Sequence, residues 1–510
     1  MSETTEPIPR RVQSVVVLGG GTAGWMTATA LARSFGPLLD IALLESDEIG
    51  TVGVGEATIP TIHWFNDLVG LDEADFLRAT QASFKLGIEF VDWARPGHRY
   101  FHPFGGYGPR ITGIPFHQRW LKACSDGLDL PISAFSLATQ LAMENRFSRP
   151  SGDMRSILST LGYAYHFDAG LYARYLRSIA EQAGVRRVEG KLRNVERDGA
   201  GGAIVALTTE RGERLAGDLF VDCSGFRALL IDGVMGSGFE DWSHWLPCDR
   251  AIAVPSERTA PLTPYTRSTA RPAGWQWRIP LQHRTGNGHV YASRFMSDDE
   301  AASMLLANLD GAPLADPRLL RFTAGTRRRP WIGNVVAIGL SSGFLEPLES
   351  TSIHLIQSGI AKLLELFPDR DMDPALASRF NARFSADMDA IKDFLLFHYH
   401  ATTDKPEPFW VERRAMQLPD SLMAREEMYR CSGRLLLAEH DIFREASWLA
   451  VLNGQGVVAA NYDPLADMLD AEANLQQVAQ AADQIRRASA QFPLHEIALG
   501  AEIAGMANVR

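Results

Sequence analysis

The feature that most limits what this chain can fold into is a run of glycines directly after a short apolar segment. Residues 19–24 supply the spacing G-x-G-x-x-G, and the β-branched residues 14–18 before them predict a buried strand. Residues 22–35 predict a helix, and residues 39–44 predict a second strand. The glycines therefore lie in the first turn of a β-α-β unit, which begins a parallel, doubly wound sheet of the α/β class.

The same turn predicts a dinucleotide site. Its glycines permit a tight turn and close approach of a pyrophosphate, and the helix N-terminus offers unpaired N–H groups to the phosphates. Glu45 ends the second strand, where an acidic side chain can bind a ribose hydroxyl. A glycine turn that only packs a helix against a sheet is the alternative. The distant segments 218–225 and 335–339 favour FAD over NAD, because an extended flavin needs contacts from a second region.

Composition excludes several classes of protein. The net charge is −11, which argues against broad nucleic-acid binding. The four cysteines are widely scattered, so neither a disulfide framework nor the spacing of a metal site is present. The uncharged stretch 12–32 resembles a signal peptide or membrane span only superficially, because its glycines form the nucleotide motif. We expect a cytoplasmic protein that binds neither metal nor membrane.

The chain changes character near residue 370. We expect residues 1–370 to form an FAD-binding module with an inserted mixed sheet, and residues 371–510 to form a mostly helical, substrate-side lobe. More local expectations are a strand at 185–195, a mixed sheet over 250–295, a long loop at 96–114, and helices at 435–443 and 471–488.

Seven ordered segments extend the glycine motif into a more specific pattern. They are residues 19–26 (GGGTAGWM), 53–60 (GVGEATIP), 84–88 (FKLGI), 165–168 (YHFD), 222–227 (DCSGFR), 274–280 (GWQWRIP, the pattern W-x-W-x-I-P) and 344–351 (FLEPLEST). With these segments the chain resembles the flavin-dependent halogenases of the tryptophan halogenase family. The resemblance covers roughly residues 13–370 and becomes diffuse afterwards.

The resemblance implies an activity and a set of partners. Reduced FAD (FADH2) and O2 convert chloride or bromide to hypohalous acid, which passes through a tunnel to a lysine and then to an electron-rich aromatic ring. The chain has one dinucleotide motif, so we expect a separate flavin reductase to supply FADH2. A homodimer is common among relatives. The cofactor contacts that we expect are Gly19, Gly21, Thr22, Ala23, Gly24, Glu45, Glu56, Leu192, Leu340 and Ile353.

The catalytic lysine implied by the resemblance is Lys85. Its neighbours Phe84, Leu86 and Ile88 are apolar, and desolvation makes the neutral form of an amine accessible. Lys85 could hydrogen-bond and polarise hypohalous acid, or form a haloamine. We expect it on a helix, with His102 in the loop that follows. The alternative is a surface lysine whose stem packs on apolar neighbours.

The catalytic acid implied by the resemblance is Glu349. Halogenation builds a cationic ring intermediate, which a carboxylate can stabilise and deprotonate. The alternative for Glu349 is a helix-capping acid. Glu346 has a place in the motif that indicates a loop-structuring role. Thr351 and Ser352 stand at the start of a helix predicted over 353–366, where backbone N–H groups suit a halide. Capping by Ser350 or Thr351 is a compatible alternative.

Two tryptophans are expected to separate substrate from flavin. Trp275 and Trp277 are two residues apart, so on a strand both face the same side. The resemblance places them near the tunnel, where they would suppress hydroxylation at the flavin; simple core packing is the alternative. His102 either lines the tunnel or substrate cavity or is a buried structural histidine.

The sequence indicates less about the substrate than about the cofactor. Relatives that act on free tryptophan grip it with adjacent tyrosines, and this chain has no Tyr-Tyr pair. Phe443 and Trp448 are the substrate-side candidates, in a differently spaced set. An indole other than tryptophan, a phenol or a pyrrole fits at least as well. A flavin hydroxylase and a non-catalytic flavin-binding protein are the alternative functions.

Overall fold

We describe the protein from a computed structural model, which places residues 10–49, 55–108, 113–199, 202–439 and 441–505. The glycine turn lies at the end of a six-stranded sheet whose central strands are parallel. In spatial order the strands are β20 (Trp331–Ile332), β21 (Val335–Ala337), β12 (Leu219–Asp222), β1 (Ser14–Leu18), β2 (Asp40–Glu45) and β8 (Arg186–Glu189). Only the β20–β21 pair is antiparallel in this sheet.

This sheet is buried on both faces, as the continuous apolar run in β1 requires. Val15 and Val17 pack into one hydrophobic core, whereas Val16 and Leu18 pack into a second core on the other side. The sequence therefore predicted the doubly wound α/β core correctly.

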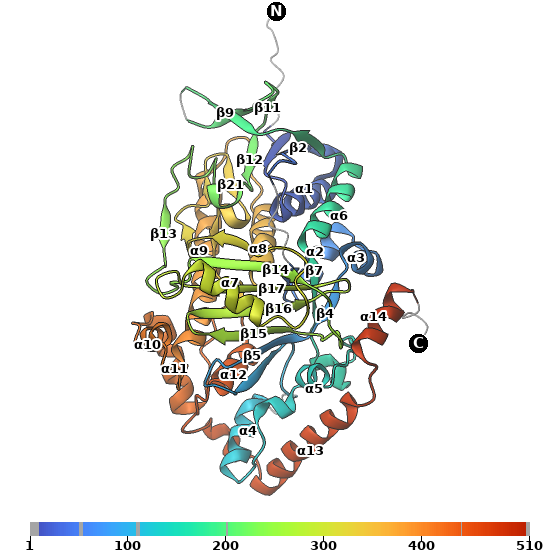
Figure 1. Cartoon of the computed structure of the whole chain (residues 1–510), viewed down its shortest axis with the longest axis vertical. Helices are drawn as coiled ribbons and strands as arrows, with labels where there is room; N and C mark the ends of the chain where they lie inside the picture. The colour runs from blue at the N-terminus through green and yellow to red at the C-terminus, as the bar shows by residue number, and fades with distance from the viewer. Residues whose placement is uncertain (1–9, 50–54, 109–112, 200–201, 440, 506–510) are drawn as a thin grey trace, which may run out of the picture.

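A seven-stranded mixed sheet lies beside the parallel sheet, in the middle of the molecule (Figure 1). Its strands in order are β18 (Arg318–Arg321), β14 (Arg250–Ser256), β17 (Thr285–Tyr291), β16 (Gly274–Pro280), β15 (Thr266–Arg271), β5 (Gly87–Val91) and β6 (Arg99–Pro103). The β15–β5 pair is parallel and its neighbours are antiparallel, so the prediction of a mixed sheet is confirmed. Every residue of β16 is buried, so this strand lies inside the molecule.

Three small sheets complete the strand structure. They are β3 (Gly55–Ala57), β7 (Ala164–Asp168) and β4 (Ser83–Lys85); β11 (Arg214–Ala216), β10 (Ile204–Thr209) and β9 (Leu192–Arg197); and β13 (Phe239–Asp241), β19 (Gly325–Arg327) and β22 (Gly343–Phe344). The first of these sheets positions the lysine that the sequence analysis singled out.

Helices cover both sheets and form most of the C-terminal part of the chain (Figure 1). They are α1 (Thr22–Phe35), α2 (Ile62–Val69), α3 (Glu73–Thr80), α4 (Phe116–Ser125), α5 (Leu137–Met143), α6 (Ala169–Gln182), α7 (Asp298–Ala307), α8 (Ser352–Glu365), α9 (Pro374–His400), α10 (Pro408–Arg414), α11 (Asp420–Ser432), α12 (Glu445–Gly454), α13 (Ala471–Ser489) and α14 (His495–Ile503). Helix α13 packs against α4 and α5, and α9 packs against α8. The division of the chain at residue 370 stays a prediction.

Four local expectations were wrong. Lys85 ends strand β4 instead of lying on a helix, and the expected loop 96–114 contains β6 with His102. The expected strand 185–195 is split between β8 and β9, which belong to different sheets. No helix occurs in the described part of 435–443, since Gly433 ends α11 in a left-handed conformation and Asp441 accepts from the backbone N–H of Ala438. Helix α13 confirms the prediction for 471–488.

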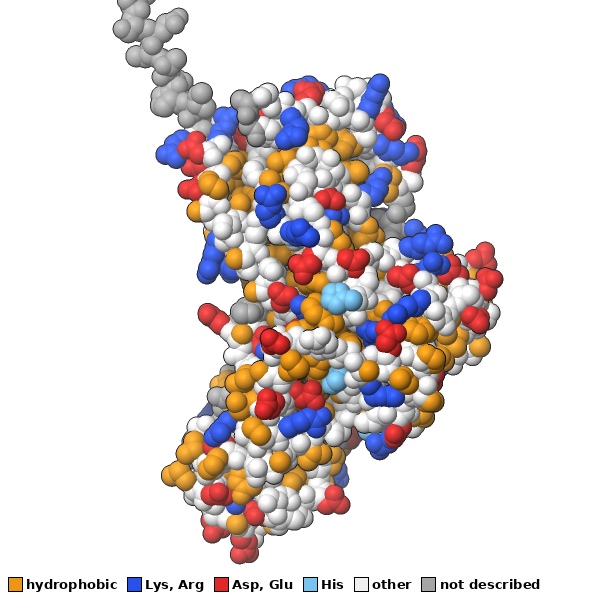
Figure 2. Space-filling model, turned by 90° about the vertical axis from the view of Figure 1, so that its left-hand side faces the viewer, with side chains coloured by type: hydrophobic (Ala, Val, Ile, Leu, Met, Phe, Trp, Pro, Cys, Tyr) orange, Lys and Arg blue, Asp and Glu red, His pale blue; other side chains and the backbone are white. Residues whose placement is uncertain are grey.

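Acidic and basic side chains are interspersed over the face shown in Figure 2. Among the residues that the structure describes, no helix combines the length and hydrophobicity needed to cross a bilayer.

Candidate active site

A cavity of about 380 Å³ opens at the glycine turn. Gly19 has a φ of +114°, and a Cβ on Gly24 would lie 1.8 Å from the carbonyl oxygen of Gly19, so both positions require glycine. Helix α1 begins after Gly21 without a side-chain cap and without an acidic residue in its first turn. Its first N–H groups are therefore open to an anion, as the pyrophosphate of a dinucleotide requires.

The walls of this cavity come from regions far apart in the sequence. Segments after β12 and β21 contribute Cys223 and Gly339, as expected for a long cofactor that spans two regions. Among the predicted cofactor and halide residues, those that line the cavity are Gly21, Thr22, Ala23, Glu56, Leu340, Ser352 and Ile353. Burial raises the pKa of Glu56 to about 7. Residues 53 and 54 of the segment before Glu56 lie outside the described residues.

Two of the predicted cofactor residues, Glu45 and Leu192, are not among the residues described as lining this cavity. Glu45 ends β2 beside Gly20, and its Oε1 accepts a 2.6 Å hydrogen bond from Arg187 Nε. Leu192 begins β9 and packs on the second hydrophobic core, and it is absent from the described lining of the cavity. The part of the site built by the glycine turn thus suits a flavin dinucleotide, whereas a cofactor contact by Leu192 stays a prediction.

Lys85 is fully buried at the end of β4, where it pairs with Ala164 of β7. Its Nζ donates to the carbonyl oxygen of Thr58 at 3.0 Å and to Ser350 Oγ at 2.8 Å, and it lies 4.9 Å from the centre of the Phe104 ring. Burial lowers the pKa of Lys85 to about 7, although the nearby charge of Glu349 acts in the opposite direction. Near neutral pH the amine is therefore available in both protonation states.

Ser350 connects this lysine to the cavity. Ser350 lines the cavity, and its hydroxyl oxygen accepts a hydrogen bond from Lys85 Nζ. Ser350 adopts a left-handed backbone conformation (φ +60°) and ends the 3₁₀ turn Pro347–Glu349. From the sequence Ser350 was expected only as a helix cap, and no sequence signal identified this contact.

Glu349 is fully buried between two histidines from different elements. His102 Nδ1 on β6 lies 2.9 Å from Glu349 Oε2, and His398 Nε2 on α9 lies 2.8 Å from Glu349 Oε1. Burial would raise the pKa of this carboxyl, but the two histidines outweigh it and lower the pKa to about 2. Glu349 is therefore ionised throughout the neutral range. Its helix-capping alternative is not supported, because both oxygens face these rings.

Glu346 lies on the same loop, but its neighbours are a tryptophan and a tyrosine instead of two histidines. Its Oε2 accepts from Trp275 Nε1 at 3.0 Å and from the hydroxyl of Tyr399. Burial raises the pKa of Glu346 to about 7, and the neighbouring donors reduce that rise only partly. Three residues apart, the two carboxyl groups thus have pKa values shifted in opposite directions, to about 7 for Glu346 and to about 2 for Glu349. These contacts support a loop-structuring role for Glu346.

The two tryptophans of β16 face the same side, as their spacing predicts. Their ring centres are 6.0 Å apart, but their neighbours differ. Trp277 lines the cavity together with Ile279, whereas Trp275 is absent from its described lining and bonds to Glu346. Trp277 is thus placed as a wall between the cavity and the buried residues behind it.

The N-terminus of α8 has no side-chain cap. Thr351 is the residue before the helix, is fully buried, and has no hydrogen-bond partner for Oγ1 among the described residues. Ser352, the first helical residue, lines the cavity. The capping roles considered for Ser350 and Thr351 are not observed, so the open N–H groups and a free hydroxyl remain for a ligand such as a halide.

Beyond Glu349, aromatic side chains from α9, α12 and the segment just before α12 meet. Phe443 stacks on Phe394 of α9 with ring centres 3.9 Å apart, and Trp448 of α12 contacts the same ring at 4.9 Å. His102 lies 6.2 Å from Phe443, between this cluster and Glu349. The predicted substrate-side residues are therefore brought together beside the predicted base.

Comparison with known proteins agrees with this geometry. The family model for tryptophan halogenase matches residues 14–471. The chain belongs to the tryptophan halogenase family. Tryptophan 6-halogenase SttH of Streptomyces toxytricini is 35% identical over 505 residues, which cover 94% of this chain and 96% of that protein. Among solved structures, BrvH, a flavin-dependent halogenase from Brevundimonas sp. BAL3, gives a TM-score of 0.93 at 44% identity and covers 97% of this chain and 100% of its own. Xcc4156, a flavin-dependent halogenase from Xanthomonas campestris, gives 0.92 at 46% identity, with 95% and 97% covered.

This tryptophan halogenase family member is therefore an enzyme, a flavin-dependent halogenase of an aromatic substrate. The sequence singled out the glycine turn, the lysine, the glutamate and the two tryptophans, whose catalytic and binding roles stay predictions. It missed His398 and Phe394, which lie on α9 beyond the segments that carry the resemblance, and it missed the link made by Ser350.

Proposed function

We propose that this halogenase uses FAD, supplied as FADH2, with O2 and chloride or bromide, and transfers the halogen through Lys85 to an indole-type ring beside Glu349. Bound in the cavity, reduced FAD supplies with O2 the oxidising equivalents that convert halide to hypohalous acid. The observation that carries the proposal is the contact between Lys85 Nζ and Ser350, a residue that also lines the cavity. The buried amine thus lies beside the cavity that would hold the flavin.

Lys85 has the properties that the transfer needs. With a pKa near 7 it can donate a hydrogen bond to hypohalous acid as an ammonium, or react as a neutral amine. Thr58 and Ser350 hold its nitrogen by two hydrogen bonds, so its position is fixed. Full burial excludes bulk water, which would otherwise carry the oxidant away.

Glu349 suits the second half of the reaction. Attack of the ring on the electrophilic halogen builds positive charge on the ring, and an ionised carboxylate in a buried site stabilises that charge. The carbon–hydrogen bond at the attacked position then breaks and its electron pair restores the aromatic ring. The carboxylate of Glu349 accepts the proton. The low pKa of Glu349 ensures that the charge is present at the start.

The remaining assignments extend the proposal. The halide binds at the open N-terminus of α8, near Thr351 and Ser352. Residues 371–510 form the substrate side of the enzyme, with Phe443 and Trp448 near the ring. The chain lacks a Tyr-Tyr pair, so an aromatic other than free tryptophan is the better candidate. A separate flavin reductase supplies FADH2, the enzyme works in the cytoplasm, and it forms a homodimer.

Incubation with FAD, a flavin reductase, NADH, O2 and indole tests the proposal, with chloride or bromide in parallel. Mass spectrometry should show a halogen isotope pattern in the product. A mass gain of one oxygen would instead identify a hydroxylase, and unchanged indole with continued flavin oxidation would contradict both enzymatic assignments for this ring.

The matched control is Lys85→Ala in the same mixture. It should abolish aromatic halogenation while oxidation of the reduced flavin continues, because Lys85 is absent from the described lining of the flavin cavity. Halogenation retained in this variant would move the transfer step to another residue.

A further inference from the structure

A second cavity, of about 410 Å³, lies on the other face of the mixed sheet from the cavity at the glycine turn. Side chains of a strand alternate between the two faces of a sheet. Trp277 of β16 lines the cavity at the glycine turn, whereas the next residue, Arg278, lines the second cavity. The remaining walls come from β15, the segment before it and the segment after α7. No step of the proposed reaction uses these residues.

Two arginines stand directly opposite each other at this cavity. Arg267 of β15 is the antiparallel partner of Arg278 of β16, a position in which like charges repel each other. Arg278 is only 6% exposed, so water screens its charge little. Asp310 accepts hydrogen bonds from Arg267 at 2.9 and 3.0 Å, and its Oδ2 forms an ion pair with Arg278 Nε at 2.6 Å. One carboxylate therefore serves two guanidinium groups.

The next acid along the sheet does not supply the missing negative charge. Glu89 of β5 lies beside Arg267 in the parallel pair of strands, but it forms its own ion pair with Arg99 of β6 at 2.8 Å. Three arginines thus face two carboxylates, which leaves one positive charge over. An excess positive charge at the wall of a cavity attracts an anion.

The polar groups around the cavity also offer more donors than acceptors. Arg278 donates to the hydroxyl oxygens of Thr263 and Thr259 at 3.1 and 2.9 Å. Neither hydroxyl donates its own hydrogen to another residue in the described part of the chain, and the hydroxyl of Tyr265 forms no hydrogen bond there. Both oxygens of Asp310 already contact the arginines. A ligand that brings acceptor oxygens would complete these hydrogen bonds.

We infer that this cavity binds a small organic carboxylate, whose charged group contacts Arg267 and Arg278 and accepts from the hydroxyls beside them. A carboxylate brings one negative charge, which matches the one positive charge left over, whereas a phosphate monoester brings about −1.5 to −2 at pH 7. The planar fork of a guanidinium also matches the two oxygens of a carboxylate. Ala260, Pro261 and the ring of Tyr265 provide apolar surface for the carbon skeleton. The volume lies within the range of about 300–1,000 Å³ that small-molecule sites occupy.

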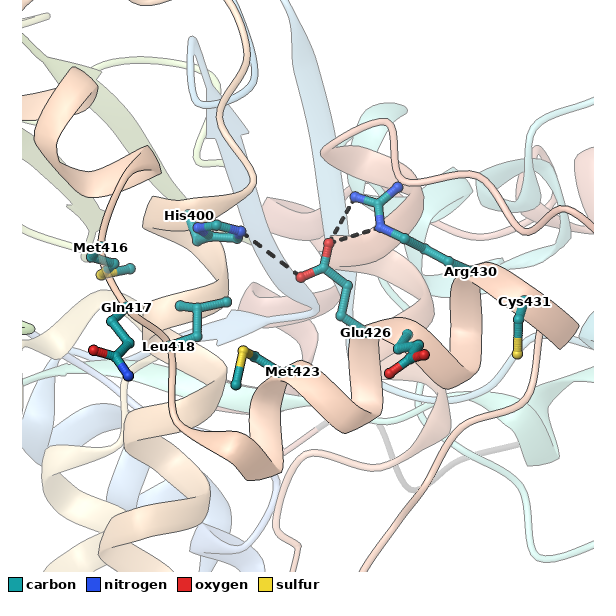
Figure 3. A pocket seen from close by; sticks show the side chains of 9 residues that line it. His400, Met416, Gln417, Leu418, Met423, Glu426, Arg430 and Cys431 are labelled. Atoms are coloured by element: carbon teal, nitrogen blue, oxygen red, sulfur yellow. Dashed lines mark hydrogen bonds and ion pairs between the residues drawn. The ribbon is translucent and has the colours of Figure 1, made fainter.

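A larger groove elsewhere on the molecule lacks this excess of positive charge. It measures about 600 Å³, and His400, Glu426 and Arg430 line it (Figure 3). Glu426 Oε1 accepts from Arg430 at 2.9 and 2.7 Å, and Glu426 Oε2 lies 4.0 Å from His400 Nε2. The arginine of this groove therefore has a carboxylate of its own, which makes Arg430→Gln the matched control.

Calorimetric titration of the full-length protein without flavin tests the inference. The probes are benzoate and inorganic phosphate, at constant ionic strength. The wild type should bind benzoate, and more tightly than phosphate. Arg267→Gln should weaken benzoate binding by about tenfold or more, because a charged hydrogen-bond donor is lost. Arg430→Gln should bind benzoate as the wild type does.

Tyr265→Phe removes one hydroxyl donor and keeps the ring, so it tests the same site even if Arg267→Gln does not fold. It should weaken benzoate binding by about threefold or more, the loss expected for one neutral hydrogen bond. The inference is overturned if the wild type does not bind benzoate, if it binds phosphate more tightly, or if the folded variants of this cavity bind benzoate with wild-type affinity. Halogenation is not measured, so failure of the proposed function would leave this result unchanged.

Discussion

Replacing Lys85 with methionine removes a buried amine while keeping an unbranched side chain of similar volume. The lysine is fully buried and its pKa falls from the ordinary 10.5 to about 7, mainly because of desolvation. The folded state therefore binds this proton more weakly than the unfolded chain does. Protonation consequently favours unfolding, and the cost to folding is fully present below pH 7 and disappears as pH rises toward 10.5.

The linkage relation gives the size of this effect. A pKa lowered from 10.5 to about 7 destabilises the folded state by about 5 kcal/mol below pH 7, of which about 2.5 kcal/mol is relieved between pH 6 and pH 9. Methionine does not titrate, but it loses the hydrogen bonds to Thr58 and Ser350, worth about 1 kcal/mol each. At pH 6 Lys85→Met should thus be more stable than the wild type by about 3 kcal/mol, and under the proposed function we expect it to lose halogenation.

Urea unfolding of both proteins at pH 6 and pH 9 measures the stability difference at pH 6 and its change with pH. Other titrating groups contribute equally to the two proteins and cancel in the difference. The stability advantage of Lys85→Met should shrink by about 2.5 kcal/mol between the two pH values. Lys191→Met, at an exposed lysine paired with Glu48, should show no comparable change. An advantage for Lys85→Met that changes by less than about 1 kcal/mol between pH 6 and pH 9 would refute the reasoning, because the amine would then be hydrated in the folded protein.

Three further substitutions test other parts of the site. Glu349→Gln should lower the halogenation rate by about 10²–10⁴-fold, with flavin oxidation unchanged, since it removes the negative charge beside the ring; an equal fall in both rates, measured by product analysis and flavin absorbance, would contradict this. Trp275→Phe should destabilise the fold by about 1–3 kcal/mol in urea, because Glu346 loses a buried donor; an effect within about 0.5 kcal/mol of zero would indicate that the bond is dispensable. Gly24→Ala should abolish flavin binding measured by fluorescence titration, since its Cβ would overlap the carbonyl oxygen of Gly19, and wild-type affinity in this variant would contradict the packing.

The parts of the fold that local sequence patterns control were predicted well. The β-branched run, the glycines and the second apolar run correspond to β1, the N-terminus of α1 and β2 within one residue. The spacing of Trp275 and Trp277 placed both rings on one side of a strand, because side chains of a strand alternate. In each case, neighbours in sequence are also neighbours in space.

The parts that failed depend on long-range pairing. Strand β4 has three residues and exists because it pairs with β7, about 80 residues later, so no local pattern required Lys85 to be on a strand. His398 reaches Glu349 only through the way α9 packs on the sheets. Ser350 contacts Lys85 because of a left-handed turn at a residue other than glycine, which sequence patterns do not indicate.

Glu346 and Glu349 have the same functional group and stand at the two ends of one short turn. Their surroundings nevertheless shift the pKa values of the two carboxyl groups in opposite directions. Those surroundings belong to Trp275 on β16, His102 on β6, and Tyr399 and His398 on α9. Transplanting residues 344–351 into another flavoprotein would therefore transfer the two glutamates without the neighbours that set their pKa values. A working graft would have to carry portions of two strands and a helix as well, which makes this loop a poor unit for modular engineering.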